Sequence, residues 1–226
     1  MPISILFVTA TSREADILRK IAVPDESGKK LISGNCIFEP LVTGVGSIAT
    51  AWATTHWFSL NPKPDLAINS GIAGSFREEI KVGEVVLPIS DRFADAGVEA
   101  DEGFLTLAEA GLEDPDRFPF TAGKITAGNR FIDRAAERMR TVEAISVNTV
   151  TGSLSTRQRL VSRYGPDVET MEGAAFFYVC KRADVPFMAF RSISNMVEAR
   201  DKSRWNIPLA LENLAAELQH FILNIR

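Results

Sequence analysis

The sequence is poor in the residues on which disulfide frameworks, histidine-based catalysis and most transition-metal sites depend. Among 226 residues there are two cysteines and two histidines. Cys36 and Cys180 are far apart, and Cys180 ends an apolar run, so both are expected to be buried thiols in a reducing compartment. His56 and His220 each fall in a helical pattern without an acidic or cysteine neighbour at ligand spacing, so we expect neither a metal site nor serine–histidine catalysis.

Long hydrophobic runs and an excess of positive charge are also missing. No apolar stretch has membrane-spanning length, and no basic region precedes the short apolar run near the N-terminus. The net charge is −4, from 25 basic and 29 acidic residues, which offers no cationic surface to nucleic acid or to an anionic membrane. The sequence therefore predicts a cytoplasmic protein that binds a small molecule, without a nucleic-acid or membrane partner.

What the sequence does contain is a regular alternation of short apolar runs and helical patterns. We expect strands near 3–9, up to residue 43, and at 65–71, 81–90, 144–152 and 185–194, with helices at 12–21, 47–58, 131–140, from 156, from 171 and at 208–225. This alternation is typical of α/β proteins with a largely parallel central sheet. Since single α/β domains of ~200 to 250 residues are common, residues 1–226 are expected to form one domain. The acidic stretch 91–120 interrupts the pattern, and such long excursions are often functional or mobile.

The first of two glycine-containing segments follows the strand that ends near residue 43. Gly44, Gly46 and Ala49 match the dinucleotide fingerprint G-x-G-x-x-A. That fingerprint also needs an acidic residue at the end of the next strand, whereas Asp65 precedes its strand. A tight turn between strand and helix is therefore the favoured interpretation.

In the second segment, Gly71 and Gly74 bracket Ile72 and Ala73. Small residues here would let backbone amides approach a flat ring, but a turn that needs positive φ explains the glycines equally well. Neither segment has the lysine and the serine or threonine of a phosphate-binding P-loop.

Two carboxylates and one amide are candidate functional groups. Glu172 follows Met171 at the start of an apolar helix, where an unpaired carboxylate costs several kcal/mol unless a ligand or the protein hydrogen-bonds to it, although the helix dipole also favours an acid there. Glu14 forms the pattern Thr11-x-x-Glu14, which predicts a capping box as readily as a catalytic base. Asn195 ends a strand, where asparagine serves either a ligand or a turn.

Five segments in this order resemble the purine nucleoside phosphorylase and nucleosidase superfamily over nearly the whole chain: TSREADIL, TGVGS, NSGIAG followed by KVGEVV, VETMEG, and FRSISN. Within this superfamily the sequence is most similar to the futalosine hydrolases, followed by the methylthioadenosine/adenosylhomocysteine nucleosidases. This resemblance implies a phosphorylase/hydrolase-like fold without metal or cofactor. It also implies a homodimer or higher homo-oligomer whose sites lie at the subunit interface.

The resemblance also assigns roles to individual residues. Glu14 becomes the base that deprotonates water near the anomeric carbon, and Glu172 accepts hydrogen bonds from the ribose while Met171 packs on the sugar. Trp205 would cover the ligand from a mobile loop, and Phe104 would reach the pocket of a neighbouring subunit. The other residues expected to bind substrate are Gly46, Ile72, Ala73, Gly74 and Thr170.

At two positions the sequence differs from relatives in this superfamily, and these differences indicate which purine base is released and which nucleophile attacks the ribose. Asn195 stands where adenosine-type nucleosidases have an aspartate, and an amide can donate to O6 or N7 of an oxopurine such as hypoxanthine. Ile72 stands where phosphorylases place a phosphate-binding serine, which favours water as nucleophile. We therefore expect a futalosine hydrolase of menaquinone biosynthesis. The alternatives are a methylthioadenosine-type nucleosidase, an inosine-type phosphorylase and a non-catalytic nucleoside-binding module. An acidic 5′ substituent on the ribose would need a basic partner, and the candidates are Arg92, Arg130 and Arg204.

Overall fold

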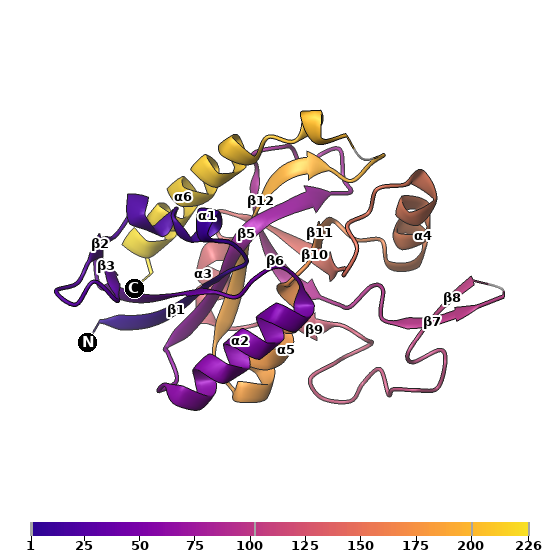
Figure 1. Ribbon diagram of the computed structural model, residues 1–226, viewed down its shortest axis with the longest axis horizontal. Coiled ribbons are helices and arrows are strands. Elements are labelled where there is room, and N and C mark those ends of the chain that lie inside the picture. Colours follow the sequence, from indigo (N-terminus) through magenta and orange to yellow (C-terminus); the bar gives the residue numbers. More distant parts are fainter. Residues whose placement is uncertain (1, 102, 200, 226) are drawn as a thin grey trace.

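The computed structural model describes residues 2–101, 103–199 and 201–225, which form a sheet with helices packed around it (Figure 1). The strands are β1 (Ile3–Thr9), β2 (Val23–Pro24), β3 (Leu31–Ser33), β4 (Cys36–Val42), β5 (Leu66–Ser75), β6 (Val85–Asp91), β7 (Gly97–Ala100), β8 (Gly103–Thr106), β9 (Ile125–Thr126), β10 (Arg140–Ser146), β11 (Val168–Thr170) and β12 (Phe187–Met196). The helices are α1 (Ser12–Ala15), α2 (Ser47–Leu60), α3 (Arg130–Ala136), α4 (Leu154–Tyr164), α5 (Gly173–Ala183) and α6 (Ile207–Leu223), with 3-10 helices at Leu18–Lys20 and Lys202–Arg204. Over these described ranges, no helix is long and apolar enough to cross a membrane.

A ten-stranded mixed sheet runs through the molecule in the order β11-β10-β6-β12-β5-β1-β4-β3-β2, with β9 attached to β6. The pairs β1–β4, β1–β5, β5–β12, β6–β10 and β10–β11 are parallel, and β6–β12 is antiparallel. β11 also pairs with β5, so that β5, β12, β6, β10 and β11 close into a ring. The expected α/β class with a largely parallel sheet is confirmed.

The centre of the sheet is formed by β5 and β12, which are buried over nearly their whole length. Such continuous burial requires cover on both faces of the strands. In Figure 1, α6 lies on one side of the sheet, and α2 and α5 lie on the other. Aromatic contacts join these layers: Phe190 of β12 packs edge-on against Phe221 of α6 (5.3 Å between centroids), and Phe187 of β12 against Phe177 of α5 (4.7 Å).

Short polar signals set the ends of several helices. Ser153 accepts a hydrogen bond from the Thr156 N–H at the start of α4, and Gly165 ends that helix in the left-handed conformation at φ +55°. Asn129 caps α3 in the same way, and Asn206 caps α6. At the helix starts, short polar side chains accept hydrogen bonds from free backbone N–H groups, and at the end of α4 a glycine adopts the left-handed conformation. The sequence therefore sets where these helices begin and where α4 ends.

Several expected elements differ in the structure. Gly71 and Gly74 lie inside β5 without positive φ, so the turn interpretation of that segment is wrong, whereas Gly44 and Gly46 have φ of +90° and +95° as a turn requires. The helix expected at 12–21 is a four-residue α1 followed by a 3-10 helix. Met171 precedes α5 instead of starting it. The 91–120 stretch contains the β7–β8 hairpin, which projects away from the sheet (Figure 1).

Candidate active site

A cavity of about 180 Å³ opens where the carboxyl ends of β5, β11 and β12 meet the starts of α1, α2 and α5. Ligands of α/β proteins ordinarily bind at this edge of the sheet. Most of the residues selected from the sequence line the cavity, namely Glu14, Ile72, Ala73, Gly74, Thr170, Met171, Glu172, Asn195 and Trp205. These residues come from segments near both ends of the chain and lie together in the folded protein. Their roles in binding and catalysis stay predictions.

Glu14 lies in the first turn of α1, and its two carboxylate oxygens have different partners. Oε2 accepts hydrogen bonds from the Thr11 N–H (2.9 Å) and Oγ1–H (2.8 Å), and Thr11 Oγ1 accepts from the Glu14 N–H (3.3 Å), which completes a capping box. Oε1 takes one long bond from the Ile72 N–H (3.3 Å), and a Cβ on Gly71 would lie only 2.7 Å from it. The cap thus uses one oxygen and leaves the other weakly held beside the cavity, so the two interpretations of Glu14 are compatible.

Glu172 lies at the N-cap of α5 and is half-buried, directly before the buried residues of that apolar helix. Its side chain makes no capping hydrogen bond to α5, so the start of this helix can favour the carboxylate only through the helix dipole. Oε1 accepts from the Gly46 N–H (2.8 Å) at the start of α2, and Ser47 Oγ donates to Met171 O (3.1 Å). Burial raises the pKa of Glu172, while the Gly46 N–H opposes the rise. Two helix starts therefore hold this carboxylate at the cavity wall.

Arg191 is a fully buried arginine close to the site, and sequence reasoning gave it no role. Its guanidinium donates to Asn69 O (2.9 Å) and to Asn69 Oδ1. Burial lowers the pKa of Arg191, while the negative charges of Glu172, Asp91 and Glu14 raise it. Its charge thereby offsets three carboxylates without a direct ion pair to any of them in the described structure. An arginine within the apolar strand FMAFRSIS was the available signal, because arginine is rarely buried without a specific purpose.

Asp91, at the end of β6, is a second buried group that the sequence did not reveal. Asp91 Oδ1 accepts from Ser146 Oγ (3.1 Å), which itself accepts from the Ala174 N–H (2.8 Å) in the first turn of α5. A Cβ on Gly173 would lie 2.0 Å from Asp91 Oδ2, so only glycine fits there. Burial raises the pKa of Asp91 to about 7. Asp91 and Ser146 therefore fix the first turn of α5, directly after Glu172.

The amide of Asn195 has a defined orientation. Ser194 Oγ donates to Asn195 Oδ1 (2.7 Å), and Asn195 Nδ2 donates to Met196 O (3.0 Å). The reversed amide would place two oxygens against each other at Met196, so the hydrogen-bond network fixes the assignment. One hydrogen of Nδ2 is used by Met196 and the other remains for a ligand.

Trp205 lines the cavity, whereas Phe104 does not. Phe104 lies in the β7–β8 hairpin against Gly97, with the guanidinium groups of Arg159 and Arg163 at 5.2 and 5.6 Å from its ring centroid. Its expected contact involves a neighbouring subunit and stays a prediction. Gly46 reaches the site through its bond to Glu172.

The three arginines considered for a 5′ substituent do not line this cavity either. Arg204 pairs with Glu198 (2.7 Å), and the Arg130 guanidinium lies 4.7 Å from the ring centroid of Phe131. Arg92 belongs to a separate cavity.

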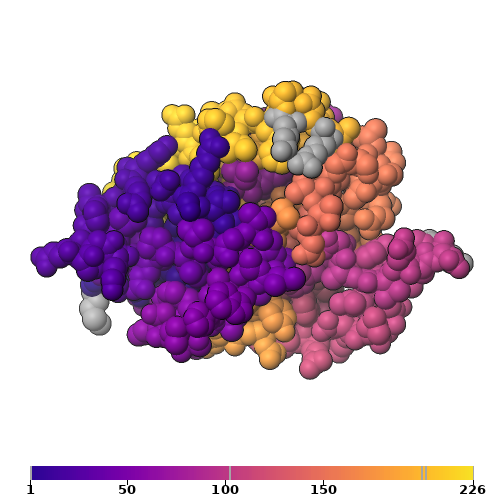
Figure 2. Space-filling model, in the orientation of Figure 1, coloured from indigo at the N-terminus to yellow at the C-terminus, as the bar shows by residue number. Residues whose placement is uncertain are grey.

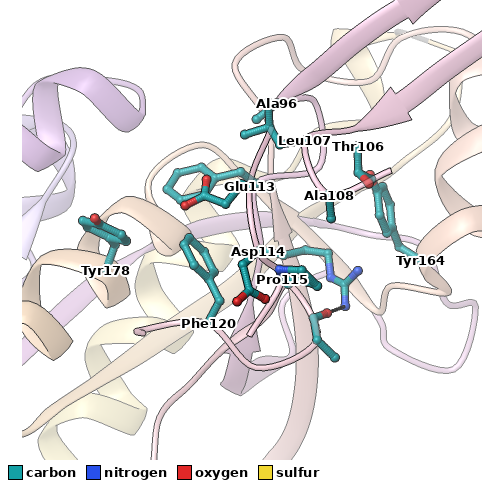
Figure 3. A pocket seen from close by; sticks show the side chains of 14 residues that line it. Ala96, Thr106, Leu107, Ala108, Glu113, Asp114, Pro115, Phe120, Tyr164 and Tyr178 are labelled. Atoms are coloured by element: carbon teal, nitrogen blue, oxygen red, sulfur yellow. Dashed lines mark hydrogen bonds between the residues drawn. The ribbon is translucent and has the colours of Figure 1, made fainter. Parts of the chain in front are cut away.

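That second cavity has a volume of about 400 Å³ and lies between the 91–123 segment and helices α4 and α5. Its lining is largely apolar and includes aromatic rings, and Figure 3 shows Phe120 beside Tyr178, with ring centroids 5.8 Å apart. The Arg92 guanidinium lies 5.1 Å from the ring centroid of Tyr164. The second cavity has acidic side chains but no amide to match Asn195, so the first cavity is the candidate active site.

Comparisons with known proteins identify the family. The family model of the phosphorylase superfamily matches residues 6–223. The 5′-methylthioadenosine/S-adenosylhomocysteine nucleosidase of Haemophilus ducreyi is 28% identical, over 99% of both chains, and the futalosine hydrolase of Acidothermus cellulolyticus is 31% identical, over 95% of this chain and 88% of that protein. The solved structure of futalosine hydrolase from Helicobacter pylori superposes with a TM-score of 0.80 at 18% identity, over 99% of this chain and 98% of that one. The chain therefore belongs to the phosphorylase superfamily, in the branch that holds these nucleosidases and futalosine hydrolases.

Proposed function

We propose that the protein is a purine nucleosidase that hydrolyses the N-ribosidic bond of futalosine, releasing hypoxanthine and dehypoxanthine futalosine in menaquinone biosynthesis. The observation that carries this proposal is the fixed amide of Asn195, which offers a hydrogen-bond donor at the cavity wall. O6 and N7 of hypoxanthine are adjacent acceptors on one edge of the base. Adenine instead presents an amino group beside N7, and the adenosine-type relatives that the sequence resembles meet N7 with an acid.

The arrangement of side chains fits hydrolysis through an oxocarbenium-like sugar. Glu172 would accept hydrogen bonds from the ribose hydroxyls, and Met171 would pack against the sugar. Glu14 Oε1 would take a proton from water as the water oxygen bonds to the anomeric carbon. The electron pair of the broken C–N bond passes to the base, where Asn195 stabilises the developing negative charge by donating to O6 or N7. The base anion then takes a proton from solvent to leave as hypoxanthine, and Glu14 returns its proton to solvent.

Water is the better nucleophile for this cavity than phosphate. Its described lining contains three carboxylates, from Glu14, Glu169 and Glu172, and neither lysine nor arginine. Such a lining repels a phosphate dianion. Ile72 also lines the cavity and has no group that can bind phosphate.

The direct test is to incubate the purified protein, in buffer without phosphate, with futalosine, inosine and methylthioadenosine, and to measure the released base by chromatography. We expect fast release of hypoxanthine from futalosine. Release that depends on added phosphate would indicate a phosphorylase instead. Fast release of adenine without release of hypoxanthine would favour a methylthioadenosine-type nucleosidase, the second candidate, because the Haemophilus ducreyi relative carries that name and matches 99% of the chain.

An Asn195→Asp variant tests the role of the amide. A carboxylic acid at this position can protonate or hydrogen-bond N7 of adenine, so the ratio of kcat/KM for adenine nucleosides over hypoxanthine nucleosides should rise by at least about tenfold, the effect of one hydrogen bond of ~1.4 kcal/mol. Ser203→Ala, which removes an exposed hydroxyl bonded to Asp201 (2.6 Å), is the matched control. An unchanged ratio in the aspartate variant would remove the argument from Asn195.

We also infer that the protein is a homodimer in which α2 contributes to the interface. Large apolar side chains on and next to α2 are exposed, with Ile48 at 84%, Trp52 at 68% and Leu60 at 69%. Ile48 and Trp52 are four residues apart and lie on one side of the helix, and Leu60 is exposed at its C-terminal end. The segment that forms α2 lies at the surface seen in Figure 2. An exposed apolar face of this kind marks an interaction site. Val45, two residues before this helix begins, also lines the cavity, so a partner on α2 would border the active site.

A further inference from the structure

Glu169 is a buried carboxylate that the proposed reaction does not use. It lies in β11, is 6% exposed and lines the cavity. Burial raises the pKa of Glu169, and the charge of Asp95 raises it further, while no lysine or arginine in the described ranges lowers it. A buried carboxylate is costly unless hydrogen bonds satisfy it. The groups that donate hydrogen bonds to Glu169 therefore indicate what this carboxylate does.

Both oxygens of Glu169 bind one residue, Thr151. Oε1 accepts from the Thr151 N–H (2.9 Å), and Oε2 accepts from Thr151 Oγ1–H. Thr151 belongs to the 147–153 connection between β10 and α4, and its neighbour Val150 lines the cavity. Ser153 holds the end of this connection by capping α4. Glu169 holds the middle, which is the part that faces the cavity.

Glu169 and Asn195 flank the same glycine. Gly74 of β5 pairs with Glu169 of β11 on one side and with Asn195 of β12 on the other. Neighbouring strands are ~4.8 Å apart, so the two residues are separated by roughly two strand spacings. A Cβ on Gly74 would lie 2.8 Å from Val197 Cγ2 and 3.3 Å from Asn195 Nδ2, so glycine lets both side chains pack closely against β5 here. Glu169, Asn195 and Val150 of the 147–153 connection line the same cavity, so a flat base bonded to Asn195 would lie close to that connection.

We propose that Glu169 is a positioning residue, which through Thr151 holds the 147–153 connection as one wall of the base-binding end of the cavity. The inference rests on the proposed function, since it takes a purine base as the ligand there. Without the two hydrogen bonds, the connection can move away from the cavity and the wall beside the base is lost. Glu14 and Glu172 are not contacted by Thr151, so ribose binding and water activation keep their geometry.

The experiment measures the affinity of the protein for free hypoxanthine and free adenine by calorimetry, at a temperature where every variant is folded. Thr151→Val removes the hydroxyl, and Glu169→Gln keeps the size but loses one acceptor. Each should weaken base binding about tenfold, the effect of one lost hydrogen bond to a charged group. The double variant should bind no more weakly than the weaker single variant, because both changes break the same contact.

Two control variants separate positioning from general stability. Thr151→Ser keeps the hydroxyl and should bind the base as the wild type does. Asn129→Ala removes the cap of α3, which lies outside the 147–153 connection and the cavity lining, and should lower the melting temperature without changing base affinity.

The proposal is overturned if Thr151→Val lowers the melting temperature but binds the base within twofold of the wild type. A wild type that binds adenine and not hypoxanthine would contradict the base assignment alone, and the same variants measured with adenine would then decide the role of Glu169. A wild type that binds neither base would overturn both.

Discussion

At the scale of single residues, Glu14 combines a structural and a predicted catalytic role, so replacing it alone would mix two effects. Its Oε2 and N–H belong to the capping box with Thr11, and its Oε1 lies beside the cavity. Loss of a cap costs about 1 kcal/mol of stability. Loss of a general base lowers turnover by about 10²- to 10⁴-fold. These magnitudes are different enough to be told apart.

We expect Glu14→Gln to lower kcat at least about 100-fold, because the amide cannot take a proton from water. Gln keeps the size of the side chain and one acceptor for the Thr11 N–H, so the melting temperature should change little. The matched variant Thr11→Ala removes the cap hydroxyl, and should lower the melting temperature while kcat falls less than about tenfold. Both are measured with the nucleoside that the wild type cleaves fastest. Full activity of Glu14→Gln would reduce Glu14 to a helix cap.

At the scale of elements, the first turn of α5 depends on a buried acid. Asp91 reaches this turn through Ser146 and lies against Gly173. In the folded protein Asp91 keeps its proton up to a pKa of about 7, whereas its ordinary value is 3.8. The folded state therefore binds more protons than the unfolded state between about pH 4 and pH 7. Because of this group, stability falls as pH rises through that window, and the loss is complete above it.

The variant Asp91→Asn should abolish this contribution, since an amide does not titrate. The free energy of unfolding of the variant minus that of the wild type should rise between pH 4 and pH 8, by up to about 4 kcal/mol, because each pKa unit corresponds to about 1.4 kcal/mol. Urea denaturation at several pH values measures this difference. Parallel curves for the two proteins would show that Asp91 is ionised throughout.

The order of elements was predictable from the sequence, but the position of several site residues within them was not. Alternating apolar runs and helical patterns predicted the longer strands and the helices, because burial on both faces of strands such as β5 and β12 leaves a strong hydrophobic signal. Gly71 and Gly74 were misplaced because glycine normally ends a strand, whereas here Glu14 packs over Gly71, and Val197 and Asn195 pack over Gly74. The need for glycine at these two positions comes from residues far away in the chain, so the local sequence does not reveal it.

At the scale of the whole molecule, the closure of the strand ring could not be predicted either. It depends on β11, a strand of three residues that pairs with both β10 and β5. A segment this short has no periodicity to detect, and its pairing with β5 joins residues far apart in sequence. The same closure places Glu169 and Asn195 on either side of Gly74, a proximity that the sequence alone does not reveal.

The exposed face of α2 predicts how two copies of the molecule assemble. We expect the wild type to be a dimer by size-exclusion chromatography with light scattering. Trp52→Glu should make it monomeric, because a charge would be buried in an apolar interface. Leu223→Glu is the matched control, since Leu223 is similarly exposed at 67% but lies at the end of α6.

Activity then shows whether the interface completes the active site. If Phe104 reaches the site of the partner, the Trp52→Glu monomer should lose activity although its own Glu14, Glu172 and Asn195 are intact. Phe104→Ala should raise KM in a protein that stays dimeric, because it removes an aromatic contact to the ligand without touching α2. A fully active Trp52→Glu monomer would confine the site to one chain, and an unchanged dimer in that variant would place the interface on another face.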